Sequence, residues 1–221
     1  MKYLQNTAAW LIALFLFVFS GCNQKPAAEH TFAIGDKTFL LDGKPFVIKA
    51  AEIHYTRIPA EYWEHRIQLC KALGMNTICI YAFWNIHEQK PGEFDFSGQN
   101  DIAAFCRLAQ KHDMYIMLRP GPYVCSEWEM GGLPWWLLKK EDIKLRTNDP
   151  YFLERTKLFM NEIGKQLADL QITKGGNIIM VQVENEYGSY ATDKEYIANI
   201  RDIVKGAGFI DVPLFQCDWS S

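Results

Sequence analysis

The sequence predicts an α/β fold of the (β/α)8 TIM-barrel type, with about the first five βα units present in these 221 residues. Almost wholly apolar segments of strand length alternate with amphipathic helical segments, which is typical of a parallel sheet buried on both faces. The long polar and aromatic loops follow the predicted strands, as they do at the working face of such a barrel. No glycine-rich phosphate-binding motif follows any strand, which argues against a nucleotide-binding sheet.

The first predicted elements lie between residues 31 and 74. Residues 31–49 hold short alternating apolar runs separated by turn residues, which predicts a segment rich in hairpins. Residues 46–53 are expected to form a buried strand, the first of the barrel. A helix is expected over 59–73, because apolar positions recur with helical spacing and Gly74 then supplies a residue suited to ending it.

The rest of the chain continues the same alternation. Apolar runs predict four further strands, and the amphipathic segments between them predict three further helices. The strands are expected at 77–83, 115–118, 177–183 and 213–217, and the helices at 101–112, 150–170 and 193–206. A complete barrel of this type usually takes about 250 residues, so we expect these residues to be the amino-terminal part of a longer domain.

The amino terminus has the layout of an export signal, in which a basic residue precedes a short apolar stretch. Lys2 is followed by the apolar residues 8–19, which are too few to span a bilayer in the ordinary way. Residues 20–22, Ser-Gly-Cys, resemble a bacterial lipobox, which would make Cys22 the lipidated first residue of the mature protein. Cleavage and secretion without a lipid stays open, because Phe19 stands where a lipobox usually has Leu.

Composition excludes some classes of partner. The formal net charge is -3 and no face rich in Lys and Arg is predicted, so we expect no nucleic-acid partner. The other five cysteines form no Cys-x-x-Cys pair and have no His at ligand spacing, so no metal site is predicted; they are Cys70, Cys79, Cys106, Cys125 and Cys217.

Aromatic residues gather in the predicted loops, where they would suit flat apolar ligands such as sugar rings. Packing at the rim of the barrel explains any single ring equally well. The residues in question are Tyr81, Trp84, Tyr123, Trp128, Trp135 and Trp136.

The end of the predicted strand 177–183 carries the most informative side chains. Glycoside hydrolysis needs one carboxyl group that donates a proton and a second that attacks or activates water, and Glu186 is the candidate donor. Neighbours in a strand point to opposite faces, so we expect a twist or bulge near Glu184 that lets Asn185 and Glu186 meet one substrate. Glu184 is expected to be a structural carboxylate paired with a cation such as Arg119, and a solvated acidic strand end is the bland alternative.

Further motifs occur in order along the chain, mostly around the ends of predicted strands. They are Ala51-Glu52-Ile53-His54-Tyr55 with Arg57-Ile58-Pro59, Asn76-Thr77 through Tyr81, Trp84-Asn85 with His87-Glu88, Pro91-Gly92 with Phe94 to Gly98, Leu118-Arg119-Pro120-Gly121-Pro122-Tyr123, Glu127-Trp128 with Gly131-Gly132-Leu133-Pro134 and Trp136-Leu137, and residues 181–190. With these motifs in this order, the chain resembles the β-galactosidases of glycoside hydrolase family 35. The likeness covers nearly everything from residue 31 to residue 221.

The resemblance implies a retaining mechanism in a (β/α)8 barrel, with the proton donor after the fourth strand and the nucleophile after the seventh. Carried over by motif, Glu186 is the acid/base, and Tyr81, Ser126, Glu127 and Asn185 bind the terminal galactose. The family usually has Ala where this chain has Ser126. Only five strands are predicted here, so the nucleophile is expected beyond the end of this sequence, and the 221 residues alone are expected to be inactive. Neither a metal nor an organic cofactor is called for.

These inferences divide the chain into a signal with a lipobox-like end at 1–22, a tether at 23–30 and part of a catalytic domain at 31–221. The expected protein is an exported, retaining exo-β-galactosidase that removes terminal non-reducing β-D-galactose from oligosaccharides or glycans. It would be anchored through Cys22 on the periplasmic or cell-surface side of a membrane, or else secreted. An exo-glycosidase of another specificity, such as a glucosaminidase, and a carbohydrate-binding protein without hydrolysis stay open.

Overall fold

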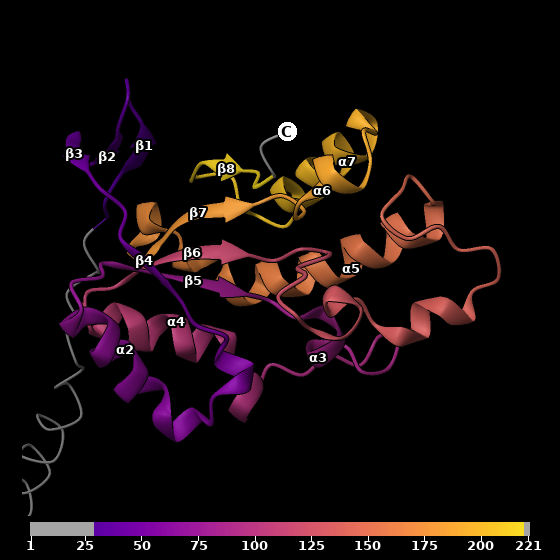
Figure 1. Ribbon diagram of the computed structural model, residues 1–221, viewed down its shortest axis with the longest axis horizontal. Coiled ribbons are helices and arrows are strands. Elements are labelled where there is room, and N and C mark those ends of the chain that lie inside the picture. The colour runs from indigo at the N-terminus through magenta and orange to yellow at the C-terminus, as the bar shows by residue number, and fades with distance from the viewer. Residues whose placement is uncertain (1–28, 219–221) are drawn as a thin grey trace, which may run out of the picture.

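The computed structural model describes residues 29–218, which form a small antiparallel sheet and a large parallel sheet with helices packed around it (Figure 1). The predicted signal at 1–22, including Cys22, lies outside the described residues, as does all but the end of the tether at 23–30. Within residues 29–218, no helix has both the length and the apolar character needed to cross a bilayer.

The amino-terminal segment is a three-stranded antiparallel sheet, as its alternating apolar runs predicted. Strands β1 (Phe32–Ile34), β2 (Phe39–Leu41) and β3 (Lys44–Phe46) pair in the order β1-β2-β3. Asp42 and Gly43 connect β2 to β3 and both have positive φ, 51° and 73°. A two-residue hairpin of type I′ needs this conformation at both positions, and Asp-Gly adopts it readily. The small sheet lies at the amino-terminal end of the large one (Figure 1).

Five parallel strands form the large sheet, in the order β4-β5-β6-β7-β8, so that each strand lies beside the next one in the sequence. This is the arrangement of one side of a (β/α)8 barrel, and the predicted α/β barrel fold with five βα units is confirmed. The strands are β4 (Ala50–Glu52), β5 (Thr77–Tyr81), β6 (Tyr115–Arg119), β7 (Ile178–Gln182) and β8 (Leu214–Phe215).

Four long helices cover the sheet in sequence order, with α2 packed on α4, α4 on α5 and α5 on α7 (Figure 1). They are α2 (Trp63–Ala72), α4 (Ile102–Lys111), α5 (Pro150–Leu167) and α7 (Lys194–Gly206). Short helices occur in the connections, namely α3 (Trp84–His87) and α6 (Tyr187–Tyr190) and the 3-10 turns η1 (Tyr55–Arg57), η2 (Ala60–Tyr62), η3 (Gly98–Asn100), η4 (Glu129–Gly132), η5 (Trp135–Lys139), η6 (Ala168–Leu170) and η7 (Ile172–Lys174).

Aspartate side chains fix where three of the long helices begin. Asp101, Asp149 and Asp193 each precede a helix and accept hydrogen bonds from backbone N–H groups of its first turn. A carboxylate at this position satisfies donors that the helix itself leaves free. Pro150 follows Asp149 at the first helical position, where its fixed φ and missing N–H cost nothing.

The two outer strands differ from the prediction. Residues 46–53 were expected to be a buried strand, but β4 contains only Ala50–Glu52, and both end residues are exposed. The predicted strand 213–217 is reduced to the two residues of β8, which are half-buried. Each outer strand pairs with one neighbour only among the described residues, so its free edge faces solvent. β5 and β7, which have neighbours on both sides, are buried along their whole length.

Two of the predicted pocket aromatics belong to the core instead. Trp84 is fully buried and stacks on Phe159 of α5, with ring centres 5.1 Å apart. Trp136 is also buried and contacts Trp84 edge-on. Of the two alternatives left open for these rings, packing therefore holds for Trp84 and Trp136.

Candidate active site

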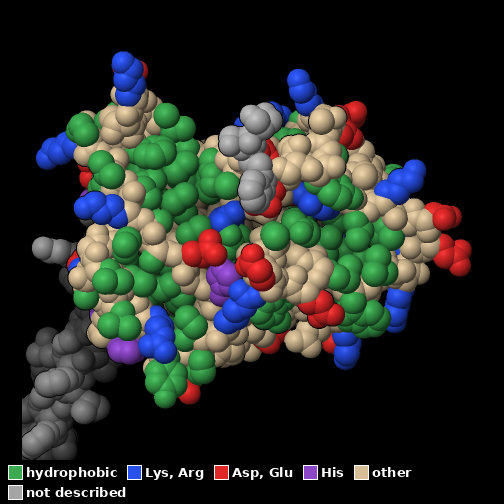
Figure 2. Space-filling view, in the orientation of Figure 1, with side chains coloured by type: hydrophobic (Ala, Val, Ile, Leu, Met, Phe, Trp, Pro, Cys, Tyr) green, Lys and Arg blue, Asp and Glu red, His purple; other side chains and the backbone are tan. Residues whose placement is uncertain are grey.

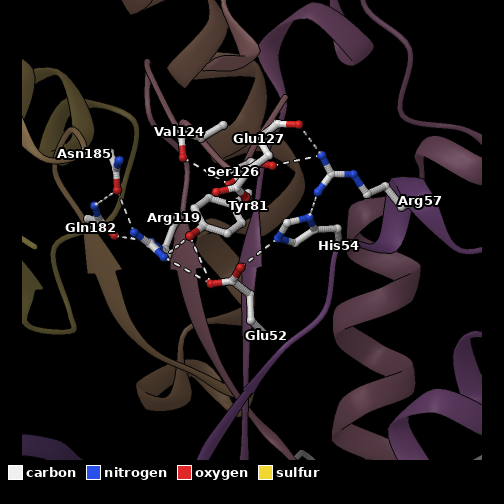
Figure 3. Close-up of polar contacts among 10 residues, drawn as sticks. All are labelled: Glu52, His54, Arg57, Tyr81, Arg119, Val124, Ser126, Glu127, Gln182 and Asn185. Carbon is white, nitrogen blue, oxygen red and sulfur yellow. Dashed lines mark hydrogen bonds and ion pairs between the residues drawn. The ribbon is translucent and has the colours of Figure 1, made fainter. Parts of the chain in front are cut away.

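Four neighbouring strands of the large sheet each end in a polar residue, and the four side chains meet at one edge (Figure 3). Glu52 ends β4, Tyr81 ends β5, Arg119 ends β6 and Gln182 ends β7. Parallel strands run in the same direction, so their last residues share the carboxyl edge, where barrel enzymes hold their reactive groups. In Figure 2, acidic, basic and His side chains gather at the middle of the viewed face, near this edge.

Arg119 joins these side chains to Asn185 (Figure 3). Its Nη1 donates to the hydroxyl of Tyr81 and, over 3.3 Å, to Oε2 of Glu52, and its Nε donates to Oε1 of Gln182. Its Nη2 donates to Oδ1 of Asn185 at 2.6 Å. Since this cation holds Oδ1, and Nδ2 of Asn185 has no hydrogen-bond partner among residues 29–218, Nδ2 is the donor left for a ligand.

Tyr81 remains a neutral hydroxyl in this setting. Burial raises its pKa well above the ordinary value for tyrosine, and the charge of Arg119 only partly opposes that shift. The hydroxyl donates to Oε2 of Glu52 at 3.0 Å, while the guanidinium carbon of Arg119 lies 4.2 Å from the ring centre. Both the ring and the hydroxyl of Tyr81 are therefore held in one orientation at the strand end.

A second chain of contacts leads from Glu52 to the loop after β6 (Figure 3). His54 Nε2 lies 2.9 Å from Oε1 of Glu52, and its Nδ1 contacts Nη1 of Arg57. Arginine can only donate, so Nδ1 accepts and the proton on Nε2 is donated to Glu52. Arg57 Nη2 also donates to the carbonyl oxygens of Ser126 at 2.9 Å and Glu127 at 2.8 Å.

The loop held by Arg57 has an unusual backbone. Cys125, Ser126 and Glu127 have successive φ values of 60°, 56° and 45°. Each residue other than glycine in this left-handed region costs roughly 1–2 kcal/mol, so the loop depends on contacts that hold it. Ser126 is buried and its Oγ donates to the carbonyl of Val124 at 3.1 Å. The carboxylate of Glu127 is exposed and makes no hydrogen bond to any residue between 29 and 218.

The chain leaves the strand conformation after β7. This was expected, because two neighbouring residues of a regular strand, such as Asn185 and Glu186, could not both face one substrate. Glu184 and Glu186 both have left-handed φ values, 59° and 50°. Asn185 is 3% exposed, whereas Glu186 is half-buried. The backbone N–H of Glu186 donates to the carbonyl of Cys217 at 2.9 Å. The predicted departure from strict alternation near Glu184 is thus confirmed.

Glu184 has the structural role that the sequence suggested, but the predicted partner was wrong. Its carboxylate is fully buried and pairs with Arg146, over 2.7 Å from Nη2 and 3.1 Å from Nε, and not with Arg119. The left-handed turn directs the Glu184 side chain away from Arg119 and toward the loop that precedes α5. Arg119 pairs with Glu52 instead.

A cleft of about 740 Å³ lies beside this group of residues and not over Asn185 and Glu186. Trp128 Nε1 donates to Oδ1 of Asn85 at 3.0 Å in its wall, and Trp135 is 54% exposed. Glu127 belongs to both places, because its carbonyl is held by Arg57 and the residue lines the cleft. The lining residues are Arg57, Asn85, Ile86, Gln89, Lys90, Glu127, Trp128, Glu129 and Trp135. Between residues 29 and 218, no cluster of His, Cys, Asp and Glu could hold a metal ion.

The sequence of this site and its scaffold matches a known family. The family model described as "Glycosyl hydrolases family 35" matches residues 38–221. This chain belongs to glycosyl hydrolase family 35. The resemblance inferred from the sequence motifs is confirmed.

Curated relatives agree with the assignment to family 35. A "Beta-galactosidase" from Xanthomonas manihotis is 43% identical over 97% of this chain and 36% of its own length. A "Beta-galactosidase" from Mus musculus is 45% identical over 83% of this chain and 28% of its own length. "Beta-galactosidase 17" from Arabidopsis thaliana is 42% identical over 86% of this chain and 27% of its own length. The chain spans about a third of the length of the curated relatives it matches.

Solved structures share the fold of this family 35 chain at low sequence identity. "GH5_18 from Streptomyces cattleya in complex with GlcNAc" matches with a TM-score of 0.60 at 13% identity, over 77% of this chain and 44% of that one. The "Exo-beta-1,4-mannosidase Op5Man5 from Opitutaceae bacterium strain TAV5" matches with a TM-score of 0.59 at 19% identity, over 75% and 30%. At such identities the likeness concerns the fold alone.

The structure ties four of the predicted site residues, Tyr81, Asn185, Ser126 and Glu127, into one network, whereas the side chain of Glu186 makes no hydrogen bond to it among residues 29–218. Tyr81 and Asn185 share Arg119, Glu186 follows Asn185, and the loop with Ser126 and Glu127 is tied to the same network through Arg57 and His54. Their roles toward a substrate stay predictions.

Sequence reasoning gave no role to Gln182, although it lies within the 181–190 motif, or to Arg146. Gln182 could have been found, because it is a polar residue at the end of an otherwise apolar strand. Arg146 gave no signal, because it lies in a loop without periodicity and is 38 residues from Glu184 in the sequence.

Proposed function

We propose that this family 35 protein is a retaining exo-β-galactosidase that hydrolyses terminal non-reducing β-D-galactose residues of oligosaccharides or glycans. Glu186 is the acid/base, and Tyr81, Ser126, Glu127 and Asn185 bind the galactose. The nucleophile is a carboxylate from a later strand of the barrel. The family match over residues 38–221 and the printed names of the relatives support the choice of reaction and sugar.

One observation separates Glu186 from the other glutamates at the ends of β4 and β7; the carboxylate of Glu127 after β6 is also unpaired, and the family motif assigns it to galactose binding. Three glutamates lie near the carboxyl edge of β4 and β7, and two of them already accept hydrogen bonds from cations. Glu52 is held by Arg119 and Glu184 by Arg146, whereas the carboxyl group of Glu186 is partly exposed and unpaired within the part of the chain that the structure describes. A general acid must have a proton to give and room to reach the leaving oxygen.

In the proposed mechanism the reaction has two steps. First, Glu186 gives its proton to the glycosidic oxygen while the nucleophile attacks the anomeric carbon and forms a covalent glycosyl-enzyme. Then Glu186 takes a proton from a water molecule, which releases galactose with its anomeric configuration retained. Asn185 Nδ2 donates to a sugar hydroxyl beside the scissile bond, and the neutral hydroxyl of Tyr81 offers a second polar contact. Two carboxyl groups suffice, so no metal or organic cofactor is required.

The test compares Glu186→Gln with wild type in the full-length protein that carries this sequence. Gln keeps the shape of the side chain but has no proton to give, so hydrolysis of unactivated galactosides should fall about 10²-fold to 10⁴-fold. Dinitrophenyl galactoside, whose leaving group needs no proton, should lose far less in the first step. Glu195→Gln, at an exposed position of α7, is the matched control and should not change the rate. Normal turnover of lactose by Glu186→Gln would reject the assignment.

Two further measurements test the stereochemistry and the sugar. Proton NMR of the first product formed should show β-galactose before mutarotation, because a retaining enzyme inverts twice. Among a panel of aryl glycosides, the full-length protein should hydrolyse the galactoside fastest. Faster hydrolysis of a glucosaminide or another glycoside would be compatible with the mechanism but would reject the proposed sugar specificity.

We also propose that the protein is exported and anchored by a lipid on Cys22. The apolar stretch at 8–19 followed by Ser-Gly-Cys supports this location. Cys22→Ala should abolish labelling with radioactive fatty acid. The variant should no longer be found in the membrane fraction as a lipid-anchored protein and should be uncleaved or soluble instead. Unchanged labelling would contradict the anchor.

A further inference from the structure

We propose that Arg146 is a positioning residue, which holds the turn after β7 in the conformation that lets Glu186 deliver its proton. Arg146 reaches the turn from the loop before α5 and does not belong to the motifs that define the site. The inference rests on the proposed function, because it assumes that Glu186 is the proton donor.

The carboxylate of Glu184 is the first anchor of this arrangement. It is fully buried and accepts four hydrogen bonds: two from Arg146, one from the hydroxyl of Tyr196 at 2.7 Å and one from the backbone N–H of Asn185 at 2.7 Å. A carboxylate has about four acceptor sites, so all are filled. Removing Arg146 would leave this buried charge without its cation, which is costly, so the pair holds the Glu184 side chain in place.

Arg146 also binds the backbone of the turn itself. Its Nη2 donates to the carbonyl oxygen of Asn185 at 2.7 Å, in addition to Oε2 of Glu184. One guanidinium group therefore holds the side chain two residues before Glu186 and the peptide group that joins Asn185 to Glu186. No other side chain between residues 29 and 218 donates to that carbonyl.

Aromatic rings keep the guanidinium of Arg146 in place. Its central carbon lies 4.0 Å from the ring centre of Tyr123 and 4.4 Å from that of Tyr190. Tyr187 donates from its hydroxyl to the carbonyl of Arg146 at 3.2 Å. Burial alone would lower the pKa of Arg146, but the hydrogen bonds and charge of Glu184 outweigh burial and raise it, so the cation is permanent.

The backbone explains why such support is needed. Glu184, Glu186 and Arg146 itself all have left-handed φ values, 59°, 50° and 55°. Residues with a Cβ adopt this region at a cost and persist in it only where the surroundings demand it. Without the bonds from Arg146, the turn is free to relax to ordinary φ values, which would swing the Glu186 side chain away from the leaving oxygen.

A second buried pair in the molecule provides a matched control. Arg155 pairs with Glu88, which is fully buried and also accepts from Trp84 Nε1 at 2.6 Å and from the N–H of Gly92 at 2.7 Å. None of these partners belongs to the proposed substrate site. Loss of Arg155 should therefore destabilise the fold without a specific effect on proton transfer.

The experiment measures kcat/KM in the full-length protein for a series of aryl and alkyl β-galactosides whose leaving groups differ in pKa. Arg146→Lys keeps the charge but loses the two-pronged contact, and Arg146→Met loses both. A shift of about 1 Å in a reacting group costs on the order of 10²-fold. We expect Arg146→Met to slow alkyl galactosides about 10²-fold and dinitrophenyl galactoside less than about 10-fold, with Arg146→Lys in between.

The pattern across variants decides the outcome. Arg155→Met should lower all substrates equally, and Glu186→Gln should show the steepest dependence on the leaving group. If Arg146→Lys or Arg146→Met lowered kcat/KM equally for all leaving groups, while the loss in Glu186→Gln depended steeply on the leaving-group pKa, only the inference about Arg146 would be overturned. If the loss in Glu186→Gln did not depend on the leaving group, the proposed function would be rejected and the inference with it. If Arg146→Met does not fold, Arg146→Lys and Tyr196→Phe, which removes one donor to Glu184, carry the same test.

Discussion

Replacement of Arg119 by Lys should lower kcat/KM toward aryl β-galactosides about 10-fold to 100-fold in the full-length protein. Arg119 uses three nitrogen atoms on different acceptors, including Gln182 and Asn185. Lysine has one ammonium group, which keeps the positive charge near Glu52 but cannot reach all of these acceptors at once. The ion pair survives and the orientation of the amide groups does not.

The magnitude follows from the contact with Asn185. The bond from Arg119 Nη2 to Oδ1, at 2.6 Å, is assisted by charge, and such bonds contribute about 1.5–3 kcal/mol. Asn185 would keep only the weaker bond from Gln182 Nε2, at 3.1 Å, so its amide is freer to rotate and present the wrong atom to the sugar. At 1.4 kcal/mol for each factor of ten, this loss corresponds to about 10-fold to 100-fold or slightly more.

A double-mutant cycle provides the assay. If Arg119 acts through Asn185, the combined variant Arg119→Lys with Asn185→Ala should be hardly worse than Asn185→Ala alone, because the amide to be oriented is already gone. Arg107→Lys, on the exposed side of α4, is the control and should behave as wild type. Fully additive losses in the cycle would refute the reasoning and assign Arg119 a separate contact with the substrate.

Three other predictions concern the scaffold. Burial lowers the pKa of His87 to about 4, whereas the value in the unfolded chain is about 6.5. Between these pH values the unfolded chain binds a proton that the native one does not, so the free energy of unfolding should fall by about 1.4 kcal/mol for each unit by which the pH is lowered. His87→Gln should flatten this dependence in thermal unfolding. Gly131→Ala would place a Cβ 2.0 Å from the ring of Tyr123 at a φ of 59°, so it should displace that ring from Arg146 and slow alkyl galactosides more than dinitrophenyl galactoside; wild-type kinetics would contradict this. The 221 residues expressed alone should aggregate, because large apolar side chains such as Leu73, which is 77% exposed, face solvent and the large sheet has two open edges. A soluble piece that melts cooperatively would be the opposite result.

The fold was largely predictable because its signals are local. Asp149 with Pro150 fixes the start of α5 through neighbouring atoms, and continuous apolar runs identify β5 and β7 wherever the rest of the chain lies. The outer strands were less predictable. An apolar run does not reveal whether a strand has neighbours on both sides, and β4, which has one neighbour among the described residues, is more exposed than β5, which has two.

The sequence by itself determined the barrel architecture, the family and the pair Asn185-Glu186, because strand periodicity and adjacent side chains are properties of short segments. Tertiary structure alone decided which cation neutralises which carboxylate. Arg119 and Arg146 are both within reach of an acidic strand end in principle, yet the left-handed turn at Glu184 directs that side chain to Arg146 and leaves Arg119 to Glu52. Such pairings depend on backbone direction over a few residues and on loops far apart in the sequence, and neither is encoded in composition or spacing.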